Sequence, residues 1–370
     1  MNSILIIAEY LLILILLICA IKRSLGLEIS SAKYNVLISP DTSQMLKAVC
    51  CIIIVLHHFA LRRQDITLLK PISIGGGNFA LPIFFILSAY GITKSELHKP
   101  INKFTGFLKK RMLKLLKPLW IINFFTIIVY FLIGANGYSS EILKQARINP
   151  LFCEIGSHSI PVWEYLLLLT GLHEIDGVVW FVEVTLYSYL VFYISKRVFP
   201  IREKRMAFVS LYTVFIILFG IMAFKMELPA HYYRNLWSLI VGLILAVYEK
   251  DFIHRIKLQY MFLCIIVIFL VIQCVLLHEY IYFPPAITAV VVIWGCGRFM
   301  KNRRILPASP IFKLAIMSYV VYLIHVKILN IEWHYIGFVS VLIPLIMILA
   351  IAYIYEFAHF KIIGKRLKTS

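Results

Sequence analysis

The residues Met45–His58 form a nearly unbroken apolar stretch, MLKAVCCIIIVLHH, with a lysine near one end and two histidines at the other. In a helix, Lys47 and His58 point within about 20° of each other and lie about 16 Å apart along the axis. His57 is turned about 100° away from His58. We therefore expect Lys47 and His58 on one face of a membrane-spanning helix. A snorkelling lysine and a hydrogen-bonded packing histidine would give the same pattern.

The composition of the 370-residue chain excludes most other classes of protein. Hydrophobic residues make up 61% and charged residues 15%, and the mean hydropathy is +0.89. Soluble chains have about 45–50% apolar and about 25% charged residues, so a soluble enzyme, a disordered chain and a collagen-like chain are excluded. The sequence predicts an all-α integral membrane protein with about eleven transmembrane helices, near residues 4–21, 44–61, 78–93, 118–136, 178–195, 206–224, 235–249, 260–278, 283–299, 310–329 and 336–360.

The basic residues predict the orientation of these spans. With the N-terminus outside, 29 of the 37 Lys and Arg residues fall in cytoplasmic segments and 8 fall outside. This bias predicts an N-terminus outside and a C-terminus inside. It also accounts for most of the net charge of +19, so no nucleic-acid partner is expected. The first span has no basic residues before it and Lys22 and Arg23 after it, which favours an uncleaved helix over a signal peptide.

The segments between the spans offer few sites of their own. The longest, about residues 137–177, is expected outside and carries five acidic residues: Glu141, Glu154, Glu164, Glu174 and Asp176. Either it shapes an extracellular substrate site or it is a solvated connector. Its apolar run Trp163–Gly171 is too short to cross a bilayer and is expected to be re-entrant or interfacial. The seven cysteines, including Cys153 in this loop, show no metal-binding spacing and imply no disulfide framework, so no metal is expected.

Two later spans carry titratable groups that are costly in a membrane. Ser318, Tyr322 and His325 share one face of the span at 310–329, because they are spaced i, i+4 and i+7. The span at 178–195 begins with Trp180 and places Glu183 one turn inside the apolar region, where a carboxylate needs a partner. Trp180 alone fits an aromatic anchor at the membrane interface. Two histidines and a carboxylate at similar depth suit proton transfer to a hydroxyl acceptor.

The segment before the span at 118–136 is strongly basic. Lys110, Arg111, Lys114 and Lys117 are spaced to form one face of a helix that ends at Pro118. Such a face suits an anionic, phosphorylated donor. A surface helix held against anionic lipid would have the same sequence.

These segments, in this order, resemble the membrane-bound acyltransferase 3 family over about residues 41–360. The Lys47–His58 pair resembles the family's basic-x10-His motif in its first core span. Four further elements resemble family motifs: Phe84–Ser88 (FF-x-LS), Arg111 with Lys114 (RxxR), Trp180-Phe181 with Tyr189 (W-F…Y), and Ser318–His325 (S-Y-x-x-Y-L-I-H). The sequence departs from the family where Ser88-Ala89-Tyr90 replaces SGF and where lysines replace arginines, which weakens bidentate phosphate recognition.

The resemblance implies a ten-span core at residues 41–370, preceded by an extra helix and cytoplasmic linker at residues 1–40. It also implies acyl transfer across the membrane, from cytoplasmic acetyl-CoA to a hydroxyl of an extracellular or lipid-linked cell-surface glycan. His58, His325 and Glu183 are then the catalytic candidates, with His58 as general base or transient acyl carrier. Lys47, Arg111, Lys114 and Lys110 are the donor-binding candidates, and Ser88, Trp180, Ser318 and Tyr322 are supporting residues.

The resemblance further implies that no cofactor is permanently bound and that the protein is a multi-pass protein of a bacterial-type plasma membrane. The sequence leaves the oligomeric state open. A protein of another class, a proton-coupled transporter or flippase of a lipid-linked saccharide, would also use basic residues and buried histidines. Neither an internal repeat nor a matched pair of broken spans supports that alternative.

Overall fold

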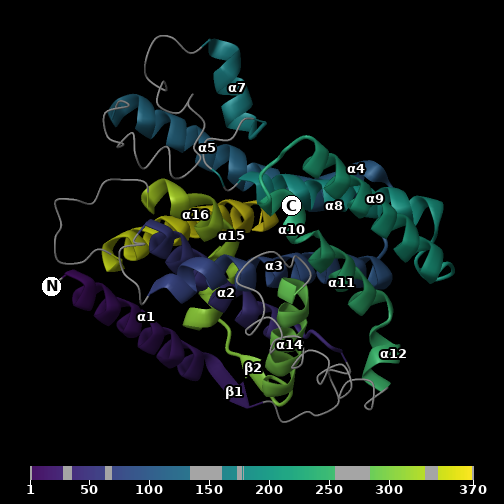
Figure 1. Cartoon of the computed structure of the whole chain (residues 1–370), viewed down its shortest axis with the longest axis horizontal. Coiled ribbons are helices and arrows are strands. Elements are labelled where there is room, and N and C mark those ends of the chain that lie inside the picture. Colours follow the sequence, from purple (N-terminus) through teal and green to yellow (C-terminus); the bar gives the residue numbers. More distant parts are fainter. Residues whose placement is uncertain are drawn as a thin grey trace.

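The computed structural model describes residues 2–27, 36–62, 69–133, 161–172, 177, 179–254, 284–329 and 341–368. This part of the chain is almost entirely helical (Figure 1). The α-helices are α1 Asn2–Ser24, α2 Pro40–Arg62, α3 Lys70–His98, α4 Phe104–Phe107, α5 Leu113–Ile133, α7 Val162–Thr170, α8 Val179–Val198, α9 Arg205–Lys225, α10 His231–Arg234, α11 Leu236–Val247, α12 Glu249–His254, α14 Pro284–Phe299, α15 Pro310–Leu329 and α16 Leu342–Lys368. The other elements are the π-helical turn η2 Leu108–Met112 and the strands β1 Leu25–Leu27 and β2 Arg303–Ile305.

Helices occur at ten of the eleven expected span positions, and the eleventh, 260–278, lies outside the described residues. Within the described residues, five helical segments are long and apolar enough to cross a membrane: Pro40–Arg62, Lys70–His98, Phe104–Val129, Arg205–Lys225 and Pro310–Leu329. The predicted multi-pass helical architecture is thereby confirmed. The number of eleven spans and the orientation stay predictions.

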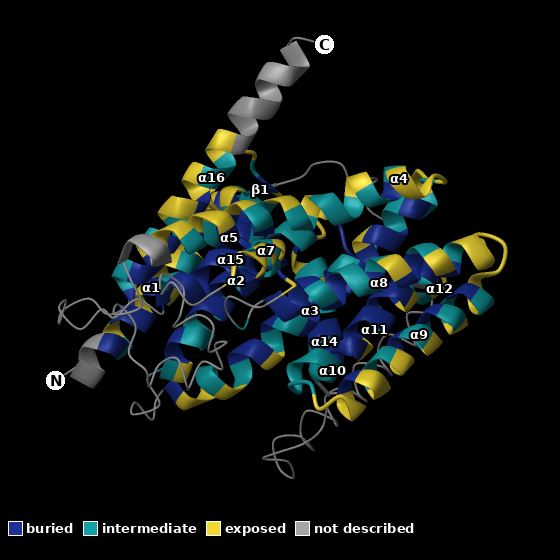
Figure 2. Cartoon of the chain, turned by 90° about the horizontal axis from the view of Figure 1, so that it is seen from above, coloured by how far each residue is buried: buried dark blue, intermediate teal, exposed yellow. Residues whose placement is uncertain are grey.

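The outer faces of several helices carry large apolar side chains. Leu14 and Ile15 of α1, Phe125 of α5 and Phe224 of α9 are each more than half exposed. Figure 2 shows the exposed positions along the outward faces of α5, α9 and α16, with the buried residues gathered between the helices. An apolar exterior of this extent suits contact with lipid.

The centre of the bundle is built by α2, α3, α11 and α15. Helix α3 packs against α2 on one side and α11 on the other, and α2 also packs against α15. Gly242 of α11 permits the closest of these approaches, because a Cβ there would lie 2.5 Å from the carbonyl oxygen of Ile86 in α3. Helix α2, which carries Lys47 and His58, therefore lies at the centre of the bundle.

Helix α1 is attached to the rest of the bundle at both ends. Near its start, the Glu9 carboxylate accepts a hydrogen bond of 2.8 Å from the backbone N–H of Val341, just before α16. The Tyr10 hydroxyl donates to the carbonyl of Leu56 in α2 at 2.9 Å. At the other end, β1 pairs antiparallel with β2, and the Ser24 hydroxyl accepts from the N–H of Ile311 at 3.1 Å.

The basic segment before α5 differs from the expectation that its helix ends at Pro118. The helix passes through Pro118 and continues to Ile133. Proline removes only one backbone hydrogen bond, and helices packed in a membrane tolerate that loss. The segment also contains the π-turn η2, in which the N–H of Leu113 bonds to the carbonyl of Leu108. Lys110, Lys114 and Lys117 are exposed, whereas Arg111 is partly buried and faces Glu96.

Of the outer loop expected at about 137–177, the structure describes residues 161–172 and 177. Helix α7 covers nine residues, which fits the expectation of a segment too short to cross. Its C-terminal carbonyls bind α5: the Asn123 side-chain amide donates to the carbonyl of Leu168 at 3.0 Å. Glu164 is buried. The other four acidic residues of the loop and Cys153 lie outside the described residues.

Candidate functional site

The structure brings His58 and His325 into contact. His58 lies near the end of α2 and His325 near the end of α15, and their ring centroids are 4.8 Å apart. His325 is completely buried, whereas His58 keeps part of its surface accessible. The two helices are also linked deeper in the bundle, where the Cys51 thiol approaches the carbonyl of Ser318 at 3.9 Å.

The hydrogen bond of His325 fixes its tautomer. Its Nδ1 lies 2.6 Å from the carbonyl oxygen of Tyr322, which can only accept a hydrogen bond. Nδ1 therefore carries a proton, and in the neutral ring Nε2 has a free lone pair. Nε2 is buried and has no hydrogen-bond partner within the described part of the chain. A buried, unsatisfied acceptor of this kind is expected at a site of proton transfer.

His57, next in sequence to His58, has a different environment. Its Nδ1 donates to the carbonyl of Ile72 in α3 at 3.0 Å. Its ring packs against two glycines of α3, since a Cβ on Gly76 or Gly77 would lie within 2.8 Å of the His57 side chain. His57 thus joins α2 to α3 by packing and a backbone hydrogen bond. His58 has no side-chain hydrogen bond to another described residue.

Aromatic rings connect the histidine pair to Glu183. Tyr322 lies between His325, at 5.6 Å between centroids, and Phe181 of α8, at 5.0 Å. Trp180, next to Phe181, packs against His231 of α10 at 4.8 Å. The Tyr232 hydroxyl donates to Glu183 at 2.6 Å. Glu183 therefore has the partner that its depth requires, and aromatic rings separate it from the two histidines.

The two supporting serines have different neighbours. The Ser318 hydroxyl donates to the carbonyl of Ala315 in its own helix at 2.8 Å. Ser88 of α3 shares a hydrogen bond of 2.9 Å with the hydroxyl of Tyr189 in α8. Tyr189 in turn lies near enough to Arg111 for an electrostatic interaction. Ser88 thus belongs to the basic end of the site, and Ser318 belongs to the framework between α2 and α15.

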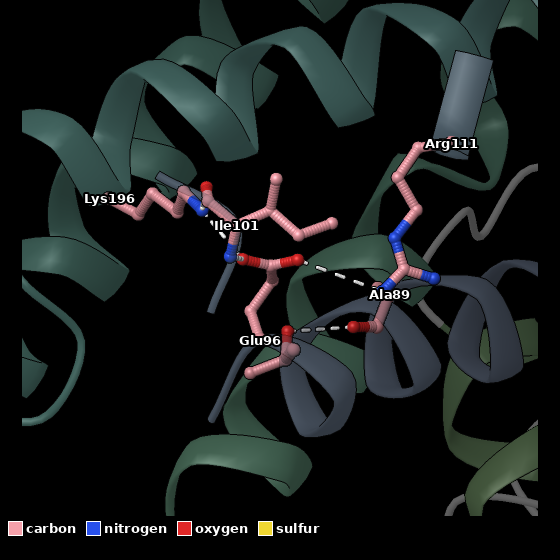
Figure 3. A network of polar contacts seen from close by, with 6 residues as sticks. Ala89, Glu96, Ile101, Arg111 and Lys196 are labelled. Atoms are coloured by element: carbon pink, nitrogen blue, oxygen red, sulfur yellow. Dashed lines mark hydrogen bonds and ion pairs between the residues drawn. The ribbon is translucent and has the colours of Figure 1, made fainter. Parts of the chain in front are cut away.

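At the basic end, the structure gathers three of the four predicted cations. Lys47 and Lys114 are close enough to repel one another, and Lys47 has no hydrogen bond or ion pair to another described residue. Arg111 lies opposite the buried carboxylate of Glu96, with 3.7 Å between Nη2 and Oε1 (Figure 3). Lys110 is exposed and is not shown to contact this group.

Sequence reasoning missed four residues of these clusters: Glu96, Lys196, His231 and Tyr232. Glu96 and Lys196 each lie at the charged end of an apolar helix, where solvated side chains are ordinary. The sequence offers one indication of their contact: they carry opposite charges at the ends of two helices that are expected to end on the same side of the membrane. His231 and Tyr232 lie in the short helix α10 between two spans. Their spacing relative to Glu183 depends on how that connection folds, which the sequence pattern does not give.

The fold and these clusters define a multi-pass membrane protein with a polar interior: a histidine pair at one end of α2 and a group of cations at the other. Residues 43–357 match the family model described as an acyltransferase domain, that of the acyltransferase 3 family. The chain belongs to the acyltransferase 3 family, and the resemblance stated from its motifs is confirmed. Searches of curated proteins and of solved structures give no match.

The family membership supports a transferase and not the transporter alternative. Helix α1 precedes the matched region, which begins at residue 43. Within the described residues no three His, Cys, Asp or Glu side chains are grouped so as to hold a metal ion.

Proposed function

We propose that this acyltransferase moves an acetyl group from cytoplasmic acetyl-CoA to a hydroxyl of an extracellular or lipid-linked cell-surface glycan. The observation that carries the proposal is that α2 has a cation cluster at one end and a histidine pair at the other. Lys47 belongs to the cation cluster, and His58, eleven residues later, touches His325. The separation along the helix is about 16 Å. The long pantetheine arm of CoA suits this separation, because it connects phosphates bound at one end with a thioester held at the other.

The proposed orientation has eleven spans in the plasma membrane, the N-terminus outside and the C-terminus inside. The 29 basic residues on the cytoplasmic side support it. In this orientation Lys47, Arg111 and Lys114 face the cytoplasmic pool of acetyl-CoA. His58, His325 and Glu183 face the outside.

The proposed chemistry needs one proton acceptor and no acyl-enzyme intermediate. His58, which is partly accessible, takes the proton of the acceptor hydroxyl as the oxygen attacks the thioester carbonyl. The Nε2 lone pair of His325 stabilises the resulting His58 imidazolium by accepting a hydrogen bond from its second N–H group. When the tetrahedral intermediate collapses, the C–S bond breaks and the CoA thiolate takes from His58 the proton that came from the acceptor hydroxyl. The products are the acetyl ester and free CoA.

The outer group suits a sugar acceptor. Glu183 can accept hydrogen bonds from sugar hydroxyls alongside the one it accepts from Tyr232, because a carboxylate has about four acceptor positions.

Sealed membrane vesicles of both orientations test the proposal. Acetyl-CoA labelled in its acetyl group is added outside the vesicles, and the label is followed into the glycan fraction. Inverted vesicles, with their cytoplasmic face outward, should label glycan in their lumen, whereas right-side-out vesicles should not. Equal labelling in both preparations, or release of CoA without any acetylated hydroxyl, would refute vectorial transfer to a glycan.

A further inference from the structure

Glu96 is a buried carboxylate with two cations beside it. It lies near the end of α3 and is 3% exposed. Its Oε2 accepts hydrogen bonds from Lys196 of α8 at 2.6 Å and from the backbone N–H of Ile101 at 2.9 Å. Lys196 also donates to the carbonyl of Ile101 at 2.6 Å. Lys196 is thus held in place by Glu96 and Ile101, which fixes the carboxylate between α3 and α8.

The second carboxylate oxygen of Glu96 faces Arg111 but is too far away to accept a hydrogen bond from the guanidinium. Oε1 of Glu96 lies 3.7 Å from Nη2 of Arg111, an ion-pair separation beyond hydrogen-bond length. Nε and Nη2 of Arg111 are buried and have no hydrogen-bond partner among the described residues, and the same holds for Oε1. Nε and Nη2 form the edge of a guanidinium that binds phosphate with two parallel hydrogen bonds. In Figure 3 this side chain extends toward Glu96 from the side opposite Lys196.

The charges around Glu96 do not cancel. One carboxylate faces two cations, and Lys47 and Lys114 contribute further positive charge at the same end of the site. Buried cations with unused donors are unfavourable without an anionic partner. The arrangement is therefore suited to a ligand that supplies negative charge and hydrogen-bond acceptors.

We propose that Glu96 is a positioning residue for the donor. It holds the Arg111 guanidinium at the basic end so that the Nε–Nη2 edge meets a phosphate of acyl-CoA. Lys196 neutralises the carboxylate and locks its orientation. This inference rests on the proposed function, since it takes acyl-CoA as the anion.

The electrostatic sign makes the proposal testable. If Glu96 acted only as a nearby negative charge, its removal would strengthen the binding of an anion. If it positions Arg111, its removal weakens binding in spite of the more favourable charge. The expected loss for Glu96→Gln is about tenfold in CoA affinity, the order expected for one misaligned hydrogen bond to a charged group.

The experiment is calorimetric titration of the purified full chain with free coenzyme A. Glu96→Gln is compared with Glu203→Gln, which neutralises an exposed carboxylate in the turn after α8. Glu96→Gln leaves Lys196 buried without its partner, so the pair variant Glu96→Gln/Lys196→Gln is measured as well. Both variants are repeated in an Arg111→Gln background, which completes a double-mutant cycle.

We expect both Glu96 variants to bind CoA more weakly than the wild type and Glu203→Gln to bind it equally well. Adding Glu96→Gln to Arg111→Gln should cause no further loss of affinity. The Michaelis constant for the donor should rise while that for the acceptor stays the same. Unchanged or tighter CoA binding by the pair variant would overturn the inference, as would additive losses in the cycle. Failure of the wild type to bind coenzyme A overturns both this inference and the proposed donor. Binding without acetyl transfer removes only the proposed reaction.

Discussion

Replacing His325 by asparagine removes the Nε2 lone pair and keeps the hydrogen bond that Nδ1 makes. The Asn amide N–H lies where Nδ1–H lies in histidine and can still donate to the carbonyl of Tyr322, 2.6 Å from Nδ1 in the wild type. What disappears is the buried acceptor at Nε2. In the proposed reaction this acceptor stabilises the His58 imidazolium, and a hydrogen bond to a charged group is worth about 1.5–3 kcal/mol. The variant should therefore lose about 1.5–3 kcal/mol of transition-state stabilisation, which is a fall in turnover of about 10- to 150-fold.

The matched control for this variant is His57→Asn. His57 makes the same kind of bond, from Nδ1 to the carbonyl of Ile72 at 3.0 Å, but it does not touch His325. Turnover is followed as release of the CoA thiol and as transfer of labelled acetyl, and thermal unfolding reports whether each variant is folded. His57→Asn should stay within a few-fold of wild type. If folded His325→Asn keeps more than about a tenth of wild-type turnover, Nε2 is not part of the proton transfer.

Three further predictions concern the ends and the centre of the bundle. His58→Gln should abolish turnover without reducing the amount of folded protein, and an active variant would remove His58 from the chemistry. The double variant Arg111→Gln/Lys114→Gln should raise the Michaelis constant for acetyl-CoA about 10- to 100-fold with little effect on the acceptor; unchanged CoA binding in calorimetry would leave these residues as lipid contacts. Gly242→Ala should lower stability by about 1–3 kcal/mol, because its Cβ would lie 2.5 Å from the Ile86 carbonyl oxygen, and thermal unfolding measures this loss.

Much of the fold could be predicted because a membrane restricts the backbone to few solutions. An apolar run long enough to span the bilayer must satisfy its hydrogen bonds internally, so each such run forms a helix. Within one helix the relative direction of two side chains follows from their spacing. The placement of Lys47 and His58 at opposite ends of α2 needed nothing more.

The positions that depend on a local break in helical geometry could not be predicted. The π-turn η2 contains one more residue per turn than an α-helix, so it changes where Lys110 and Arg111 point. Arg111, which pairs with Glu96, lies in that turn. Contacts between helices, such as that of His58 with His325, were expected only because the proposed chemistry needs them close. No single-helix pattern in the sequence gives the neighbour of a helix.

The attachment of α1 at both ends has a consequence for how the chain is assembled in the membrane. This helix is synthesised long before Ile311 and Val341, to which Ser24 and Glu9 bind, because Glu9 and Val341 are 332 residues apart. At about 5–20 residues per second, the ribosome needs about 15–70 s to make the intervening chain. During that interval the Glu9 carboxylate lacks the Val341 amide, and the β1–β2 pair cannot form until residues 303–305 have been made. Helix α1 can therefore complete these contacts only after Val341 has been made, and every earlier intermediate of biogenesis must accommodate α1 without them.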